Sequence, residues 1–148
     1  MFGLFTVNTT PRAMRREDGV TGVPRTFPPD DHGVPMAFAS FGPVGLQMIV
    51  DPHLPDSLLS HETIHRMGLG SYLQTMEINH QVNSRYGSGG ATRFPLPFMN
   101  FGHGKSLTVN DLLVCVLEHD MGYDVLGMSF LSRVHWERHG GYIDVRPL

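Results

Sequence analysis

Short apolar runs separated by turn residues dominate the chain from residue 34 to its end. The clearest pair, residues 35–41 and 44–50, flanks Gly42-Pro43, a spacing typical of a β-hairpin. Residues 112–117 are apolar throughout, which predicts a strand buried on both faces. Further strand-like runs are residues 57–59, 72–82, 94–101, 134–137 and 142–145. The pattern predicts a mainly β, barrel-like domain.

Two short helices are expected among these strands. Ser60 is a suitable N-cap for a helix over residues 61–67, and Gly68 follows where a left-handed residue usually ends a helix. Residues 127–133 predict the second helix. The glycine-rich stretch 85–90 predicts a flexible hairpin tip, because glycine restricts the backbone least.

The first 33 residues lack this pattern of alternating strands and turns. Proline and glycine recur there, four arginines balance four acidic residues, and the few large apolar side chains are scattered. Such a segment has little means of burying itself, so it becomes ordered by lying on another surface. We therefore expect an extended arm over residues 1–33 that contacts a protein partner, followed by a domain over residues 34–148.

Composition narrows the class of protein further. The 148 residues suit one domain, and 41% hydrophobic with 17% charged residues is a globular composition. A net charge of −3, with no basic run longer than Arg15-Arg16, argues against a nucleic-acid partner. Neither a membrane span nor a secretory signal is expected, which leaves the compartment open between cytoplasm and mitochondrion. Cys115 is the only cysteine and lies in an apolar run, so we expect a buried, unreactive side chain.

Two separated segments carry a specific combination of motifs. Residues 48–51 read Met-Ile-Val-Asp, and a short apolar run, a capped helix and Gly68-Leu69 follow. Residues 125–133 read Val-Leu-Gly-Met-Ser-Phe-Leu-Ser-Arg. In order and spacing these resemble the single-domain, retropepsin-like aspartic peptidases, whose first motif ends in Asp-Thr/Ser-Gly-Ala and whose second is Leu-Leu-Gly-Met-x-Phe-Leu. The resemblance covers about residues 34–148 and implies a closed β-barrel of the acid-protease fold with one or two short helices.

The resemblance also implies a function and a site. In that family each chain of a homodimer contributes one aspartate, here Asp51, to a site where two carboxylates share a proton and activate water. The following residues depart from the family's pattern: Pro52 lacks the hydroxyl that cross-links the two active-site loops, and His53 replaces a glycine. These changes favour a non-catalytic structural or interaction subunit of a larger assembly. An active homodimeric aspartic endopeptidase using Asp51 is the alternative.

A second motif points to different chemistry. Residues 61–65 read His-Glu-Thr-Ile-His, which places His61 and His65 on one helix face with a glutamate beside them, as in zinc peptidases. Those enzymes use a longer helix and a third ligand, whereas Gly68 ends this helix early. The candidate third ligands are His80, His103 and His119. A small zinc metallopeptidase is the third alternative, and we expect no metal at His61 and His65 and no cofactor.

Overall fold

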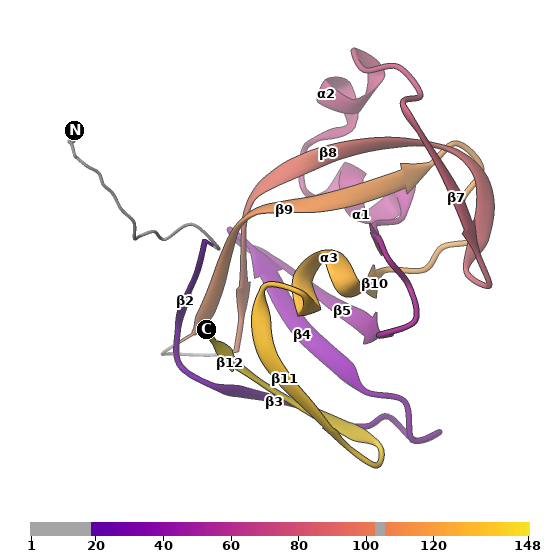
Figure 1. Ribbon diagram of the computed structural model, residues 1–148. Helices are drawn as coiled ribbons and strands as arrows, with labels where there is room; N and C mark the ends of the chain where they lie inside the picture. The colour runs from indigo at the N-terminus through magenta and orange to yellow at the C-terminus, as the bar shows by residue number, and fades with distance from the viewer. Residues whose placement is uncertain (1–18, 103–105) are drawn as a thin grey trace.

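The computed structural model describes residues 19–102 and 106–148 as a mainly β molecule (Figure 1). Its strands are β2 (Val20–Gly22), β3 (Arg25–Phe27), β4 (Met36–Phe41), β5 (Val44–Val50), β6 (Ser57–Leu58), β7 (His80–Ser84), β8 (Gly87–Phe101), β9 (Leu107–Leu117), β10 (Val125–Leu126), β11 (Val134–His139) and β12 (Tyr142–Pro147). Its helices are α1 (His61–Arg66), α2 (Gly70–Gln74) and α3 (Met128–Leu131). None of the helices in the described part of the chain is long and apolar enough to cross a membrane.

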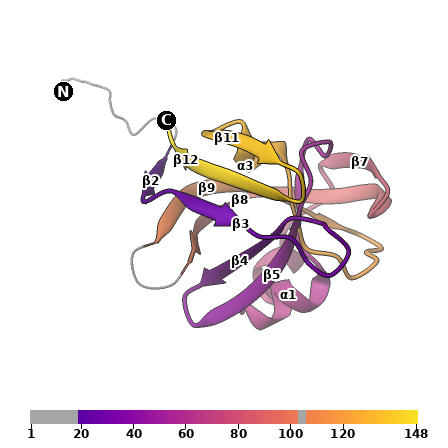
Figure 2. The same ribbon diagram turned by 90° about the horizontal axis from the view of Figure 1, so that it is seen from below.

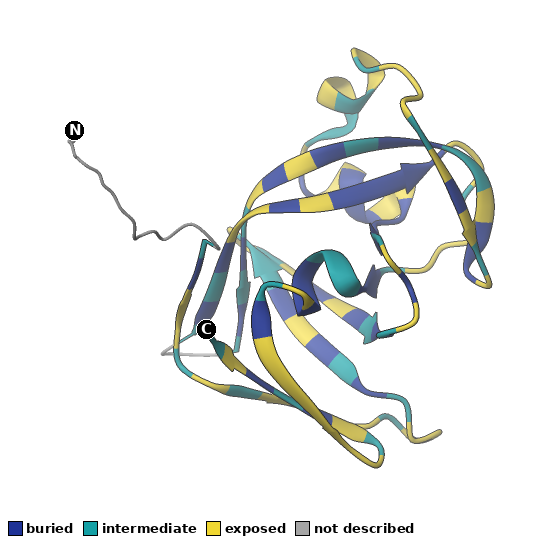
Figure 3. Ribbon diagram, viewed as in Figure 1, coloured by how far each residue is buried: buried dark blue, intermediate teal, exposed yellow. Residues whose placement is uncertain are grey.

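Six strands close into a barrel in the order β9-β6-β10-β5-β4-β8, because β8 also pairs with β9. β2 adds to the outside of β9, and β7 adds to β8. Buried residues alternate along β4 and β5, whereas β6 and β10 are wholly buried, and the buried side chains form two apolar clusters (Figure 3). The expected mainly β, closed barrel with short helices is confirmed.

The parallel pairing of β5 and β10 organises the centre of the barrel. Val125 lies opposite Ile49 and Leu126 opposite Val50, so the two motif-bearing segments run side by side. β9, which contains the apolar run 112–117, is a strand that pairs with β8 and β6. The resemblance to the retropepsin-like family implies the first arrangement, and the predicted strand over residues 112–117 is confirmed, although Leu113 within it is exposed.

Local signals placed the hairpins and the first helix correctly. β4 and β5 form the first hairpin, with Gly42 at a φ of +58° in its turn. The Ser60 side chain accepts a hydrogen bond from the backbone N–H of Thr63 at the start of α1, and Gly68 adopts a φ of +77° after its end. β11 and β12 form the expected last hairpin.

One strand expectation is wrong. Residues 72–82 do not form a single strand, because α2 occupies Gly70–Gln74 and β7 begins only at His80. Leu69, Leu73 and Met76 pack against the core, and their spacing of four and three residues is helical rather than alternating.

The expected arm is also corrected where the structure describes it. β2 pairs with β9, and β3 pairs with β12, so residues 20–27 belong to the folded domain. The Phe27 side chain is only 3% exposed and packs on Phe101, with ring centroids 5.6 Å apart. Residues 1–18, the remainder of the expected arm, lie outside the described residues.

A small second sheet flanks the barrel. Its order is β11-β12-β3, and Figure 2 shows it lying along one side of the barrel, above β4 and β5. Ile143 and Val145 of β12 are buried, whereas every residue of β11 after Val134 is exposed (Figure 3). β11 is therefore an outer strand with a solvent-facing surface.

Candidate active site

The turn after β5 folds across the end of β10. The Asp51 N–H donates to the Leu126 carbonyl (3.0 Å), and the Met128 N–H donates to the Leu54 carbonyl (2.8 Å). A Cβ atom on Gly127 would lie 2.1 Å from the Asp56 carbonyl oxygen and 2.5 Å from that of Leu54. Only glycine allows this close approach, which explains the Leu-Gly-Met sequence at this point.

Ser57 braces the same turn from β6. Its Oγ accepts a hydrogen bond from the Gly127 N–H (3.0 Å) and lies 2.7 Å from Ser129 Oγ. Ser129 Oγ also donates to the Leu113 carbonyl (2.9 Å), which extends the contact to β9. Nothing in the sequence indicates this role for Ser57 beyond its place at the start of a predicted strand. The brace lies within one chain.

Both oxygens of the Asp51 carboxylate are engaged by the chain's own residues. Oδ1 accepts from the His53 backbone N–H (2.8 Å) and lies 3.2 Å from His53 Nδ1. Oδ2 accepts from the Tyr86 hydroxyl (2.7 Å), and the Arg85 guanidinium stands 3.7 Å away. With these neighbours in place, Asp51 is only 7% exposed.

Tyr86 reaches Asp51 from the turn between β7 and β8. Figure 1 shows this hairpin at the same end of the molecule as the segment leading into β10. The resemblance to the retropepsin-like family implies that it corresponds to the flap that covers the substrate in that family, and we call it the flap hairpin. The Tyr86 ring is buried, packs edge-on against Tyr123 (5.6 Å) and lies under the Arg85 guanidinium. The sequence signal that indicates this contact is an aromatic residue, Tyr86, directly before a glycine-rich run. The glycines alone predicted the hairpin tip and did not predict the contact with Asp51.

The electrostatics of the site favour an ionised Asp51. Burial alone raises the pKa of a carboxyl group, but the hydrogen bonds from Tyr86 and His53 and the charge of Arg85 together hold the pKa of Asp51 below its usual value. The pKa of Tyr86 is raised by burial and by its hydrogen bond to Asp51. The Asp51 carboxylate is therefore stabilised as an anion, and the neutral Tyr86 hydroxyl donates a hydrogen bond to it.

Little space remains beside Asp51. The adjoining cavity measures about 240 Å³ and is lined by the turn after β5 and the hairpin tip. Ligand sites usually enclose about 300–1,000 Å³, and a peptide substrate needs an extended cleft. The cavity beside Asp51 is smaller than this range.

Among the described residues, His61 and His65 do not belong to any group of three close donor atoms that could hold a metal ion. α1 spans six residues, with His61 and His65 both exposed. The His61 ring Nε2 donates to the Leu117 carbonyl, and its backbone N–H donates to Asp120. His80 instead contacts Asp56 and His119 lies in a turn, while His103 lies outside the described residues.

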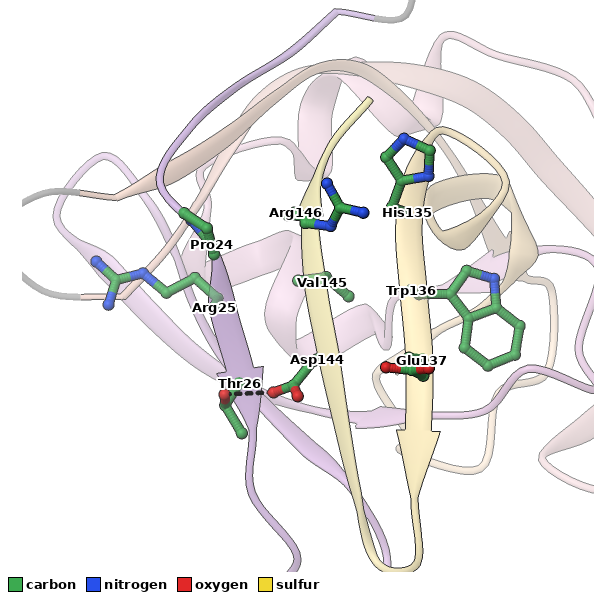
Figure 4. A pocket seen from close by; sticks show the side chains of 9 residues that line it. All are labelled: Pro24, Arg25, Thr26, His135, Trp136, Glu137, Asp144, Val145 and Arg146. Atoms are coloured by element: carbon green, nitrogen blue, oxygen red, sulfur yellow. Dashed lines mark hydrogen bonds between the residues drawn. The ribbon is translucent and has the colours of Figure 1, made fainter.

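A larger cavity lies away from Asp51. It measures about 510 Å³ and is formed by β3, β11 and β12, the three strands of the small sheet (Figure 4). Figure 4 shows Trp136 and Glu137 on β11 and Asp144 and Arg146 on β12, with Thr26 of the neighbouring strand β3 donating to Asp144 (2.6 Å). The side chains that line this cavity carry charges of both signs and include one exposed aromatic ring, Trp136. Such a lining is more typical of a surface that contacts another protein than of a catalytic centre.

Comparison with known proteins supports the fold assignment. No protein-family model and no curated protein sequence matches the chain. The crystal structure of a retropepsin-like aspartic protease from Rickettsia conorii is similar to it, with a TM-score of 0.67 and 18% sequence identity over 85% of this chain and 92% of that chain. At this identity the similarity concerns the fold. The chain has the closed β-barrel of the retropepsin-like fold.

Proposed function

We propose that this chain is a non-catalytic retropepsin-like domain that serves as a structural or interaction subunit of a larger protein assembly. The proposal rests mainly on the buried Asp51 carboxylate. Its two oxygens accept hydrogen bonds from the His53 backbone N–H and the Tyr86 hydroxyl of the same chain. Catalysis by two aspartates needs one of them to be protonated, and a second carboxylate nearby raises one pKa to achieve this. In this chain, the hydrogen bonds from Tyr86 and His53 and the charge of Arg85 lower the pKa of Asp51, which favours its ionised form.

The turn after Asp51 supports the same proposal. Pro52 offers neither a hydroxyl group nor an N–H, so it provides no link to a second active-site loop. Ser57 supplies a hydroxyl brace in this region, but it joins β6 to Gly127 within one chain. The turn is therefore held without a partner's loop.

The interaction role rests on the small sheet. β11 is an edge strand with five exposed residues in a row, and strand edges of this kind offer unpaired backbone groups to another chain. The exposed Trp136 ring and the groove in Figure 4 lie on the same sheet. Tryptophan and arginine are the residue types that most often dominate protein interfaces.

A protease assay tests the catalytic part of the proposal. The full-length protein, offered an unfolded protein substrate at acid pH, should show no pepstatin-sensitive cleavage and should match its Asp51→Asn variant. The variant that combines Pro52→Thr, His53→Gly and Tyr86→Phe is the minimal change for restoring activity, because it returns the hydroxyl and the glycine and removes the contact on Oδ2. Cleavage by the unaltered protein that Asp51→Asn abolishes would establish the homodimeric endopeptidase instead.

A further inference from the structure

Three side chains with different donor atoms meet near the end of β9. The Asp56 carboxylate, the His80 imidazole and the Cys115 thiol place one donor atom each within 4.8 Å of the others. They come from the turn before β6, the first residue of β7 and the interior of β9. Because the three segments are far apart in the sequence, the fold itself brings these groups together.

The sheet fixes the three positions. Leu58 lies opposite Cys115 in the parallel pair of β6 and β9, and Asp56, two residues before Leu58, lies close to the Cys115 side chain. His80 pairs with Ala91 of β8, and Ala91 pairs in turn with Leu117. Two hydrogen bonds between the Asn79 side chain and the Arg93 backbone (2.7 and 3.0 Å) hold the start of β7 in place. The cluster is therefore anchored from three directions.

The cluster lies among charges of both signs, because the Asp56 carboxylate and the Arg93 guanidinium both act on Cys115. His80 Nε2 lies 3.3 Å from Asp56 Oδ2, and the Cys115 side chain is buried, at 1% exposed. A divalent ion between the sulfur and the carboxylate would stabilise both as anions, which is the usual coupling of metal binding to thiol ionisation.

We propose that Asp56, His80 and Cys115 form a binding site for a divalent cation of the zinc class, with water as the fourth ligand. Sulfur, nitrogen and oxygen donors together are typical of zinc and related ions, and calcium or magnesium prefer oxygen alone. Donors around tetrahedral zinc stand about 3.5 Å apart, so small side-chain rotations close the observed arrangement. Asp56 and His80 are both partly exposed, which gives the ion and the water access.

The ion would act as a structural clamp. Asp56 ends the turn that starts at Asp51, and His80 begins the strand that leads to Tyr86. Binding at Asp56 and His80 would tie the base of the flap hairpin to that turn. This inference stands apart from the proposed function, since a clamp of this kind suits a catalytic and a non-catalytic domain equally.

A cobalt titration of the metal-free, full-length protein tests the site. Co²⁺ should bind at one equivalent, produce a thiolate-to-cobalt charge-transfer band and release about one proton per ion. Zn²⁺ should displace it and raise the melting temperature. Cys115→Ser should remove the band, and His80→Gln should weaken binding on the order of tenfold or more. The matched control is the double variant His61→Ala with His65→Ala, which should bind as the unaltered protein does.

Three results would overturn the proposal. They are the absence of a charge-transfer band that saturates at one equivalent, an unchanged band in Cys115→Ser, and a loss of binding in the His61→Ala, His65→Ala control. If Cys115→Ser does not fold, the partly exposed positions decide the matter. In that case unchanged cobalt affinity in both Asp56→Asn and His80→Gln would count against the site.

Discussion

At the scale of single residues, the proposed function and its alternative differ in the role that they give to the Asp51 carboxylate. The same position can serve as half of a catalytic pair or as an internal anchor for the hairpin tip, and the difference lies in what its two oxygens contact. Here Tyr86 and His53 provide hydrogen bonds that strengthen when Asp51 is charged. A carboxylate held in this way stabilises the folded state, and the stabilisation has a definite pH dependence.

The first prediction at this scale concerns Asp51→Asn. The folded pKa of Asp51 lies below its unfolded value, so its contribution is present above about pH 4 and is lost as pH falls through the folded pKa. We expect Asp51→Asn to lower the free energy of unfolding by about 1–3 kcal/mol at pH 7 and by much less at acid pH. Denaturant unfolding from pH 7 to pH 2 measures this, with the exposed Asp31→Asn as control. Equal losses at both pH values would show that the hydrogen bonds to Asp51 contribute nothing through its charge.

At the scale of elements, the sequence predicted what local signals determine. The hairpin of β4 and β5 and the capped α1 follow from turn residues and a cap. Local patterns could not predict contacts between distant segments, and the pairing of β5 with β10 was expected only from the resemblance to the retropepsin-like family. β2 and β3 are three residues each, too short for a periodic pattern, and their partners lie more than 80 residues away in the sequence. Nor could any local pattern bring Asp56, His80 and Cys115 together.

The prediction at this scale tests β3 as part of the domain. Phe27 is buried against Phe101 and Phe130, so Phe27→Ala should cost about 3–5 kcal/mol in the free energy of unfolding. Phe38→Ala is the matched control, because Phe38 also lies on a strand but is 52% exposed, and it should cost far less. Chemical denaturation of the two variants gives the comparison. Similar small losses in both would restore the view that residues before 34 form a removable arm.

At the scale of the whole molecule, there are two candidate surfaces through which the protein could contact another chain. One is the hairpin tip over Asp51, which a homodimeric peptidase would have to open and pair with its copy. The other is the outer surface of β11 and the groove of the small sheet, on a different side of the barrel (Figure 1). The first surface is already closed by contacts within the chain, whereas the second has an exposed tryptophan and an edge strand. The two functions therefore predict different effects of surface substitutions on assembly.

The last prediction uses one substitution on each surface. In extracts of cells that naturally make the protein, it should elute in a complex well above its own 16.5 kDa. Trp136→Glu should release it, because a charge replaces an aromatic anchor on β11, and the side chain is 37% exposed, so the fold should tolerate the change. Arg85→Ala, at the exposed hairpin tip, should leave the complex intact. Melting temperatures of both purified variants should stay near that of the unaltered protein, which excludes unfolding as the cause.

Two outcomes would contradict this prediction. Release of the protein by Arg85→Ala, with retention by Trp136→Glu, would place the interface at Asp51, as the homodimeric endopeptidase requires. Elution at the monomer mass throughout would contradict the subunit role.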